Sequence, residues 1–169
     1  IAAGRPGCIS SIGLGTFIDP KQSGGRLGLG QEELVERIQL GGRTWLCYKA
    51  FPIHVAFIRA TAADLNGGLV MDDEATIGDV LPIAQAVHNS GGLVIAQVRR
   101  ILDRPANPKS VRVPGILVDH IVLAELNQHQ QTFGVEFNPQ FCDVPPEDEA
   151  TPVIDVLPLD ERRIIACRA

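Results

Sequence analysis

The sequence has little from which a disulfide scaffold or a membrane span could be built. Its four cysteines, Cys8, Cys47, Cys142 and Cys167, stand far apart and form no Cys-x-x-Cys pair, which is not the spacing of a disulfide framework or a zinc site. No apolar run approaches the roughly twenty residues that a membrane span needs. The first residues also show no charged-then-apolar signal segment. We therefore expect reduced, mostly buried thiols in a cytoplasmic protein with no membrane partner.

Positive charge is scarce as well. The chain has 15 Lys and Arg against 20 Asp and Glu, which gives a net charge of −5, and its densest basic cluster is Arg99, Arg100 and Arg104. Because nucleic-acid binding needs a concentrated basic surface, we expect no nucleic-acid partner. An anionic small substrate needs only one or two local cations and stays possible.

Neither a metal site nor a dinucleotide site is indicated, so we expect no cofactor. The four histidines lack the spacing of metal ligands: His54, His88, His120 and His129. We interpret His129, which stands among glutamines, as a hydrogen-bonded loop residue, and Asp64 with Asn66 as a side-chain-to-backbone turn. Gly28-x-Gly30 is followed by Gln31-Glu32-Glu33 instead of a third glycine, which excludes a dinucleotide fingerprint.

What the chain does have is glycine near its start. Its 169 residues, 45% hydrophobic and 21% charged, are typical of a globular domain. An apolar run from Cys8 to Leu14 leads into a loop with six glycines within eighteen residues. Glycine at this density lets the backbone adopt φ > 0 and approach a ligand or a strand closely. The loop is either a binding loop or a set of ordinary turns, and both interpretations stay open.

Apolar runs predict the strands of a central sheet. They cover residues 53–58, 93–98 and 116–123, and we expect the last two strands to be covered on both faces, as in a parallel sheet flanked by helices. Residues 35–40 and 44–48 predict a hairpin around Gly41-Gly42. Residues 69–71 predict a short edge segment, and residues 103–114 a proline-rich loop.

One amphipathic helix is predicted at 72–89, between the first two of these strands. Asp72 and Asp73 are candidates to cap its start, and Gly91-Gly92 closes it. Pro82 is expected to kink or split it. The order of elements predicts an α/β fold with an open, largely parallel sheet and flanking helices.

Several sequence blocks are recognisable together. They are 13–20 (GLGTFIDP) with Gly24-Gly25, 48–53 (YKAFPI), 57–64 (FIRATAAD), 89–92 (NSGG), 113–119 (VPGILVD), 128–133 (QHQQTF) and 157–162 (LPLDER). In this order they resemble the family I coenzyme A-transferases, in the short-chain acetate/propionate (acyl-CoA:acetate/3-ketoacid) branch. The departures are Ala60-Thr61-Ala62, where Gly-Thr-Thr is more usual, and Glu125-Leu126, where a Pro-Pro-like pair is expected.

The resemblance implies covalent catalysis by groups outside this chain. In the family a glutamate attacks the acyl-CoA thioester and then carries CoA as a glutamyl thioester, while a glycine-rich loop stabilises the oxyanion. The resemblance places that glutamate, in a glycine-containing turn, and that loop beyond the two ends of this chain. None of the nine glutamates here precedes Gly or Asn. Glu136 is the least poor substitute, and its alternative interpretation is a surface residue at a strand edge.

The candidate binding residues also follow from the resemblance. Gly13, Gly15, Gly24 and Gly25 are candidates for a wall of the acyl or pantetheine cavity, with purely structural turns as the alternative. Arg59, expected at a strand end, would bind a carboxylate or phosphate, or form a structural ion pair. Coenzyme A enters as a substrate of the parent family.

We therefore expect an internal part of a CoA-transferase that exchanges CoA between a short-chain acyl-CoA and a carboxylate acceptor, inactive by itself. The alternative is a non-catalytic, stand-alone α/β binding or assembly module. The expected divisions are a partial α/β domain at 1–138, an acidic proline-rich linker at 139–158 and the start of a helix at 159–169. Uncovered sheet edges would favour a homo-oligomer.

Overall fold

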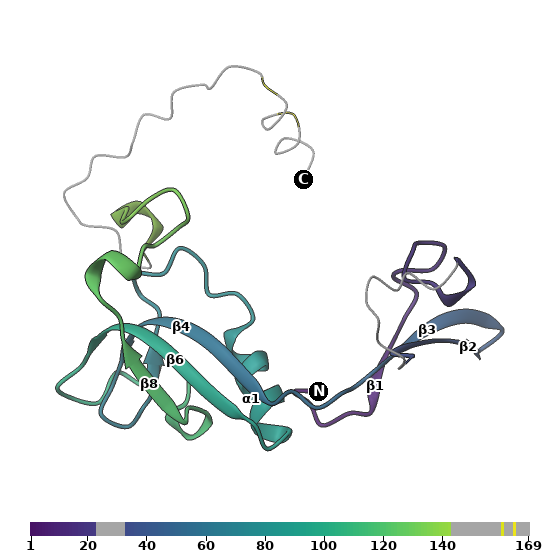
Figure 1. The fold of residues 1–169 in the computed structure, drawn as a ribbon, viewed down its shortest axis with the longest axis horizontal. Coiled ribbons are helices and arrows are strands. Elements are labelled where there is room, and N and C mark those ends of the chain that lie inside the picture. Colours follow the sequence, from purple (N-terminus) through teal and green to yellow (C-terminus); the bar gives the residue numbers. More distant parts are fainter. Residues whose placement is uncertain (23–32, 143–159, 161–163, 165–169) are drawn as a thin grey trace.

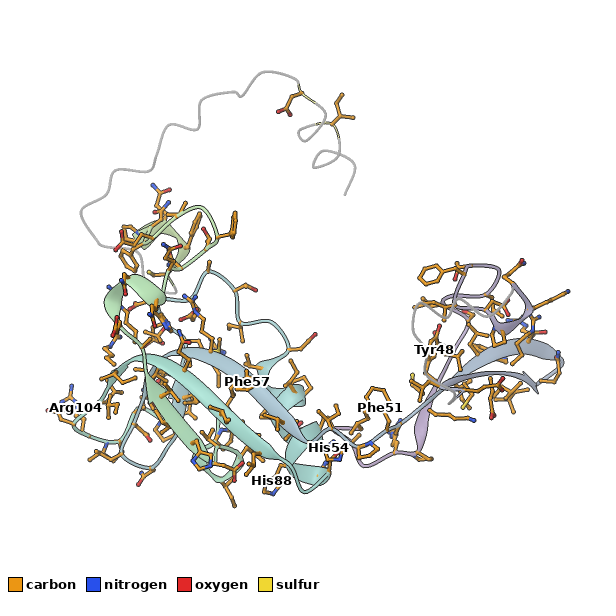
Figure 2. The ribbon with its side chains drawn as sticks, viewed as in Figure 1. Tyr48, Phe51, His54, Phe57, His88 and Arg104 are labelled. Atoms are coloured by element: carbon orange, nitrogen blue, oxygen red, sulfur yellow. The ribbon has the colours of Figure 1, made fainter. Side chains whose placement is uncertain are left out.

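The computed structural model describes residues 1–22, 33–142, 160 and 164. They form two separate sheets, which lie at opposite ends of the long axis (Figure 1). Residues 50–54 connect them, and Figure 2 shows Phe51 and His54 in this connection. The predicted boundary at residue 138 stays a prediction, and most of the predicted linker and terminal helix lies outside the described residues. Among the described residues, no helix is long and apolar enough to cross a membrane.

The small sheet contains the predicted hairpin. It is antiparallel, in the order β1 (Gly7–Ser10), β3 (Arg43–Lys49), β2 (Val35–Leu40). Gly41 and Gly42 have φ of 60° and 73°, the left-handed values that a tight two-residue hairpin turn needs at both central positions. The hairpin prediction is therefore confirmed. Leu46 on β3 is fully buried beneath the loop that follows β1.

The large sheet has five strands in the order β7-β5-β4-β6-β8. Their bounds are β4 Val55–Ala63, β5 Leu69–Val70, β6 Leu93–Ile101, β7 Val111–Val113 and β8 His120–Leu123. The pairs β4–β6 and β6–β8 are parallel, as predicted, whereas β5 pairs antiparallel with both β4 and β7. The α/β fold is confirmed, with a mixed sheet and one α-helix among the described residues.

Two local predictions in this sheet are wrong. Residues 69–71 are buried inside the sheet, because the proline-rich stretch 103–114 contains β7, which covers their outer side. Of the run 116–123, only β8 is a strand. It follows a short 3-10 turn, Gly115–Leu117. Directly before β8, the Asp119 carboxylate accepts the Val94 amide of β6 at 2.7 Å.

The helix α1 spans Val80–Asn89 and begins eight residues later than predicted. Asp73 does not cap it, because its carboxylate pairs with Arg100 at 2.7 Å and its amide donates to the Thr61 hydroxyl. Pro82 therefore lies in the first turn, where its missing N–H has no intrahelical partner to lose, and it neither kinks nor splits the helix. The helix closes as predicted, with Gly91 at φ 71° and the Gly92 amide on the Val87 carbonyl at 2.9 Å.

The core lies between α1 and one face of the large sheet. Ala84 and Val87 of α1 pack with Ala56 and Ile58 of β4 and with alternate residues of β6. The expectation that the later strands are covered on both faces is wrong for the described residues. All four residues of β8 are exposed, and Phe57 on the other face is 80% exposed, because α1 covers only one side.

Asp64 ties the end of β4 to the loop before β7. One carboxylate oxygen accepts the Asn66 and Gly68 amides at 2.9 and 2.8 Å, and the other accepts the Ala106 amide at 2.9 Å. The predicted side-chain-to-backbone turn of Asp64 with Asn66 is thus confirmed. The Ala106 amide above all, with those of Gly68 and Asn66, holds the pKa of Asp64 below its ordinary value of 3.8, against the opposing effect of burial.

We predict that Asp64 contributes to acid sensitivity. Because its pKa is lower in the folded than in the unfolded chain, its stabilisation is present above about pH 4 and is lost as the pH falls through the lowered value. Asp64→Asn should reduce stability at neutral pH and flatten the loss below about pH 4. Urea unfolding across this pH range measures both effects, with the exposed Asp103→Asn as control. Identical acid profiles for Asp64→Asn and the unsubstituted chain would contradict the assignment.

Candidate functional site

Arg59 is the centre of the candidate site. It was expected at a strand end, but β4 continues to Ala63, so Arg59 lies in the middle of the strand opposite Gln97 of β6. Its Nε donates to the Glu74 carboxylate at 2.8 Å, which confirms the structural ion pair. The Arg59 side chain is 37% exposed. Within the part of the chain that the structure describes, its two η nitrogens have no hydrogen-bond partner.

Glu74 joins Arg59 to a buried histidine. The second carboxylate oxygen of Glu74 lies 3.0 Å from His129 Nε2, and both side chains are nearly inaccessible. His129 Nδ1 lies 3.3 Å from Gln97 Nε2, which also donates to the Gln128 carbonyl at 3.1 Å. A neutral imidazole with its proton on Nε2 satisfies both contacts. The interpretation of His129 as a hydrogen-bonded loop residue is confirmed.

Gln131 holds the segment after β8 next to Asp73, the neighbour of Glu74 in the sequence. Its Nε2 donates to the Asp73 carbonyl at 2.7 Å, and its Oε1 accepts the Asn138 amide at 2.7 Å. Further along the segment, the guanidinium of Arg99 lies 5.1 Å from the centre of the Phe137 ring, a cation–π distance. The segment after β8 is therefore held over the face of the sheet that carries Arg59 and Gln97, beyond the carboxyl end of the parallel strand β8. Open α/β sheets commonly bind ligands beyond the carboxyl ends of such strands.

Among the described residues, three pockets share Arg59 as a lining residue. One, of about 540 Å³, lies between Arg59 and the segment 127–133 and is lined mostly by polar side chains. A second, of about 360 Å³, is an apolar groove over Phe57, Ile95 and Val122. The third, of about 250 Å³, runs toward Glu74 and the start of α1. Arg59 thus lines one mostly polar pocket and two pockets that are more apolar than the first.

The glycine loop of the small sheet is ordered by Asp19. This buried carboxylate accepts the Gly15 amide at 2.9 Å, the Lys21 amide at 3.0 Å and Arg37 Nη1 at 2.7 Å. The Gly15 amide, ahead of those other donors, holds the pKa of Asp19 below its ordinary value against the effect of burial. Gly13, at φ 96°, has no room for a side chain, because a Cβ there would lie 2.5 Å from the Tyr48 hydroxyl.

The predicted binding residues are not brought together. Gly13 and Gly15 lie in the loop that follows β1 of the small sheet, and Arg59 lies on β4 of the large one. Figure 2 shows the distance between these parts, with Tyr48 beside the glycine loop and Phe57 two positions before Arg59. Gly24 and Gly25 lie outside the described residues. Glu136 is exposed in a loop instead of at a strand edge, and its carbonyl accepts the Gln131 amide at 2.9 Å.

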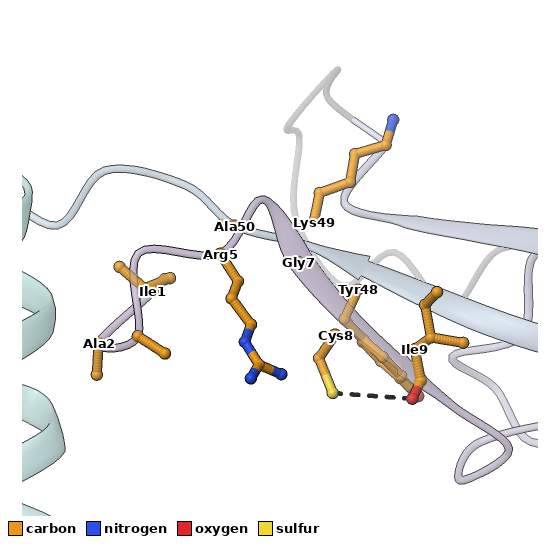
Figure 3. Close-up of a pocket in the computed structure, with 10 residues that line it drawn as sticks. Ile1, Ala2, Arg5, Gly7, Cys8, Ile9, Tyr48, Lys49 and Ala50 are labelled. Atoms are coloured by element: carbon orange, nitrogen blue, oxygen red, sulfur yellow. Dashed lines mark hydrogen bonds between the residues drawn. The ribbon is translucent and has the colours of Figure 1, made fainter.

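A further pocket, of about 720 Å³, lies where the chain enters the small sheet. Figure 3 shows Arg5 and Cys8 extending to one side of β1 and Lys49 to the other, where Lys49 pairs with Glu36. Cys8 is exposed, and Cys47 and Cys142 are half-buried, so the prediction of mostly buried thiols is wrong for these three. They form no disulfide. Among the described residues, no group of His, Cys, Asp and Glu is arranged to hold a metal ion.

Glu74 is the residue that sequence reasoning missed. It stands fifteen positions after Arg59, in a stretch that was assigned to the helix, so nothing indicated that its carboxylate would turn back to β4. Gln97 gave a weak signal, since it is the polar residue in an otherwise apolar run from Leu93 to Val98.

We predict that Glu74 holds the segment after β8 in place. Glu74→Gln removes the negative charge between Arg59 and His129 and should lower the free energy of unfolding by about 2 kcal/mol. Hydrogen exchange should show faster exchange at the Gln131 and Thr132 amides. Glu36→Gln, which breaks an exposed pair with Lys49, is the control and should cost less than about 1 kcal/mol. Equal effects of the two substitutions would contradict the role of Glu74.

Comparison with known proteins bears on all of these residues. The coenzyme A transferase family model matches residues 2–124. The chain is 44% identical over 172 residues to a caffeate CoA-transferase of Acetobacterium woodii, covering 100% of this chain and 32% of that protein. It is 42% identical over 170 residues to the acetate CoA-transferase YdiF of Escherichia coli O157:H7, covering 99% of this chain and 32% of YdiF.

The fold agrees with the sequence match. The crystal structure of the acyl-CoA transferase YdiF from Escherichia coli O157:H7, as a thioester complex with CoA, matches with a TM-score of 0.79 at 40% identity, over 99% of this chain and 31% of that chain. The chain therefore spans about a third of the length of the relatives it matches. Sequence and fold together confirm the resemblance: this chain belongs to the coenzyme A transferase family and corresponds to part of its longer members.

Proposed function

We propose that this chain is part of an enzyme that moves CoA between a short-chain acyl-CoA and a carboxylate acceptor, and that the 169 residues alone do not catalyse the exchange. The identity to relatives named as caffeate and acetate CoA-transferases supports the reaction class. The covalent mechanism expected of the family needs a glutamate nucleophile and an oxyanion loop. Glu136, the least poor substitute for that nucleophile in this chain, lies exposed in a loop.

The observation that carries a binding role is the geometry of Arg59. Its Nε donates to Glu74, and within the part of the chain that the structure describes neither η nitrogen has a hydrogen-bond partner. The Arg59 side chain lines the pockets around β4. A guanidinium held at one nitrogen offers a preorganised pair of donors to a carboxylate or a phosphate. We therefore propose Arg59 as the anion-binding residue of this part of the enzyme.

The glycines are secondary candidates for binding in this proposal. Gly13, Gly15, Gly24 and Gly25 remain candidates for a wall of the acyl or pantetheine cavity. For Gly13 and Gly15 the contacts with Tyr48 and Asp19 already account for the local fold. A cytoplasmic location and a homo-oligomeric state complete the proposal, the second supported by the exposed edge strand β8.

The function is tested in a chimera in which this chain replaces the matching third of YdiF. We expect the chimera to exchange CoA between acetyl-CoA and labelled propionate and the isolated chain to show no turnover. Arg59→Gln in the chimera should raise KM about tenfold or more, because a charge-assisted hydrogen bond contributes about 1.5–3 kcal/mol. Arg100→Gln is the matched control, since Arg100 pairs with Asp73 and lines none of the three pockets around Arg59.

Two results would overturn the proposal. A correctly folded chimera without CoA exchange would contradict the assigned reaction. Turnover by the isolated chain that disappears with Glu136→Ala would show that the nucleophile lies in this chain.

The oligomeric state is tested by light scattering at micromolar concentrations. We expect a dimer or larger assembly of the isolated chain, because β8 offers unpaired backbone groups and four exposed side chains at the sheet edge. Ile121→Lys on β8 should shift the chain toward monomer. Leu40→Lys, on an exposed residue of the small sheet, should leave the assembly unchanged. A monomeric unsubstituted chain would exclude association through this edge.

A further inference from the structure

His129 is a buried titratable residue that the proposed function does not use. Its side chain is 3% exposed, and each of its two ring nitrogens lies within hydrogen-bond distance of one side chain. Glu74, from the segment between β5 and α1, lies beside Nε2, and Gln97 of β6 lies beside Nδ1. Both partners belong to the described part of this chain, so the network is complete within it.

A backbone carbonyl determines where this imidazole carries its proton. A carbonyl oxygen only accepts hydrogen bonds, so the 3.1 Å contact with the Gln128 carbonyl identifies the nitrogen of the Gln97 side-chain amide. The same nitrogen lies 3.3 Å from His129 Nδ1 and donates to it, which leaves the proton of a neutral ring on Nε2. His129 Nε2 then donates to Glu74 Oε1 at 3.0 Å. One carbonyl thus sets the direction of each hydrogen bond as far as Glu74.

Glu74 transmits this arrangement to Arg59. The carboxylate oxygen that His129 does not use accepts Arg59 Nε at 2.8 Å. A carboxylate beside an arginine commonly forms a bidentate pair, with one oxygen on each of two guanidinium nitrogens. Here the second oxygen is occupied by His129, and neither η nitrogen of Arg59 has a partner among the described residues. The histidine therefore prevents the bidentate pair that would engage an η nitrogen.

We propose that His129 is a positioning residue for Arg59. By occupying one oxygen of Glu74, it limits the Glu74 contact to Arg59 Nε and keeps both η nitrogens available to an anion. His129 does not touch the anion and acts through Glu74. This role deepens the anion-binding role of Arg59 and rests on the proposed function. Because Gln128 and His129 both belong to the segment after β8, anion binding by Arg59 depends on the placement of that segment.

Two substitutions at His129 separate the roles of its two nitrogens. The side-chain amide of Gln brings a donor near the position of Nε2, whereas the shorter side chain of Asn reaches only the position of Nδ1. His129→Gln should therefore keep the donor to Glu74. His129→Asn should lose that donor while it keeps an acceptor for Gln97. His88→Asn, at an exposed position near the end of α1, is the control.

NMR spectroscopy of the isotope-labelled 169-residue chain tests the geometry. In the unsubstituted chain we expect the nitrogen chemical shifts of a His129 ring protonated on Nε2. His129→Asn should produce an Arg59 η N–H signal protected from exchange with water, which marks a bidentate pair with Glu74. His129→Gln and His88→Asn should show no such signal.

Gln97→Leu provides a second route to the same result. It removes the donor to His129 Nδ1, so the ring proton is no longer confined to Nε2, and part of the η signal should appear. This variant keeps the test decisive if His129→Asn does not fold. A proton on Nδ1 in the unsubstituted chain overturns the proposal, as does a folded His129→Asn whose Arg59 signals are unchanged.

The chimera with YdiF tests the consequence for binding. His129→Asn should raise about fivefold the same KM that Arg59→Gln raises, with kcat nearly unchanged, because weaker anion binding affects ground state and transition state alike. A merely structural defect would reduce the amount of folded enzyme, which lowers kcat and leaves KM unchanged. In the Arg59→Gln background, His129→Asn should not raise KM further, since both substitutions act on one contact. Equal KM values for His129→Asn and His129→Gln, or a full effect of His129→Asn without Arg59, overturn the proposal.

The two tests separate this proposal from the proposed function. An inactive chimera, together with the expected Arg59 signals in the chain, removes the proposed reaction and supports the positioning of Arg59 by His129. An active chimera in which Arg59→Gln raises KM and His129→Asn does not removes the role of His129 alone.

Discussion

The Glu74 carboxylate is the interaction on which the candidate site depends. It accepts Arg59 of β4 on one oxygen and contacts His129 of the segment after β8 on the other. Three stretches that are distant in sequence therefore meet at one buried anion, which needs both partners to remain favourable in the interior. The same contact holds the Arg59 guanidinium so that its remaining nitrogens face the pockets. Site geometry and local stability thus have one common cause.

The large sheet explains why these stretches can meet. Parallel pairing of β4, β6 and β8 brings their carboxyl ends to one edge. The segment that leaves β8 supplies His129, and the segment between β5 and α1 supplies Glu74. The helix α1 covers one face and leaves Phe57 and the pockets around Arg59 on the accessible side. This arrangement follows a general property of α/β sheets, in which ligand sites form where loops leave the strands.

The sequence predicts which helices and strands form better than it predicts where they begin and end or which residues they contact. Period and turn signals identify the hairpin at Gly41-Gly42, the parallel strands and the closing Gly91, because each depends on residues close in the chain. The start of α1 was misplaced because Asp73 binds Arg100, a partner 27 positions away. Arg59 was singled out from the sequence, yet its partner Glu74 was not. That pairing depends on how a loop folds back over the sheet, which no local pattern specifies.

The contrast between the two sheets has a kinetic consequence. In the small sheet, β2 and β3 pair across a two-residue turn, so this contact forms between neighbours in the chain. In the large sheet, Val55 pairs with Leu93 and Ile95 with His120, and each pairing must close a long loop before any contact compensates the lost entropy. We therefore expect the hairpin to form early in folding. The part of the large sheet that carries Arg59 and His129 should be completed late. Until then β8 and its neighbours are exposed to wrong pairing, and this part of the sheet is the one whose folding most needs protection in the cell.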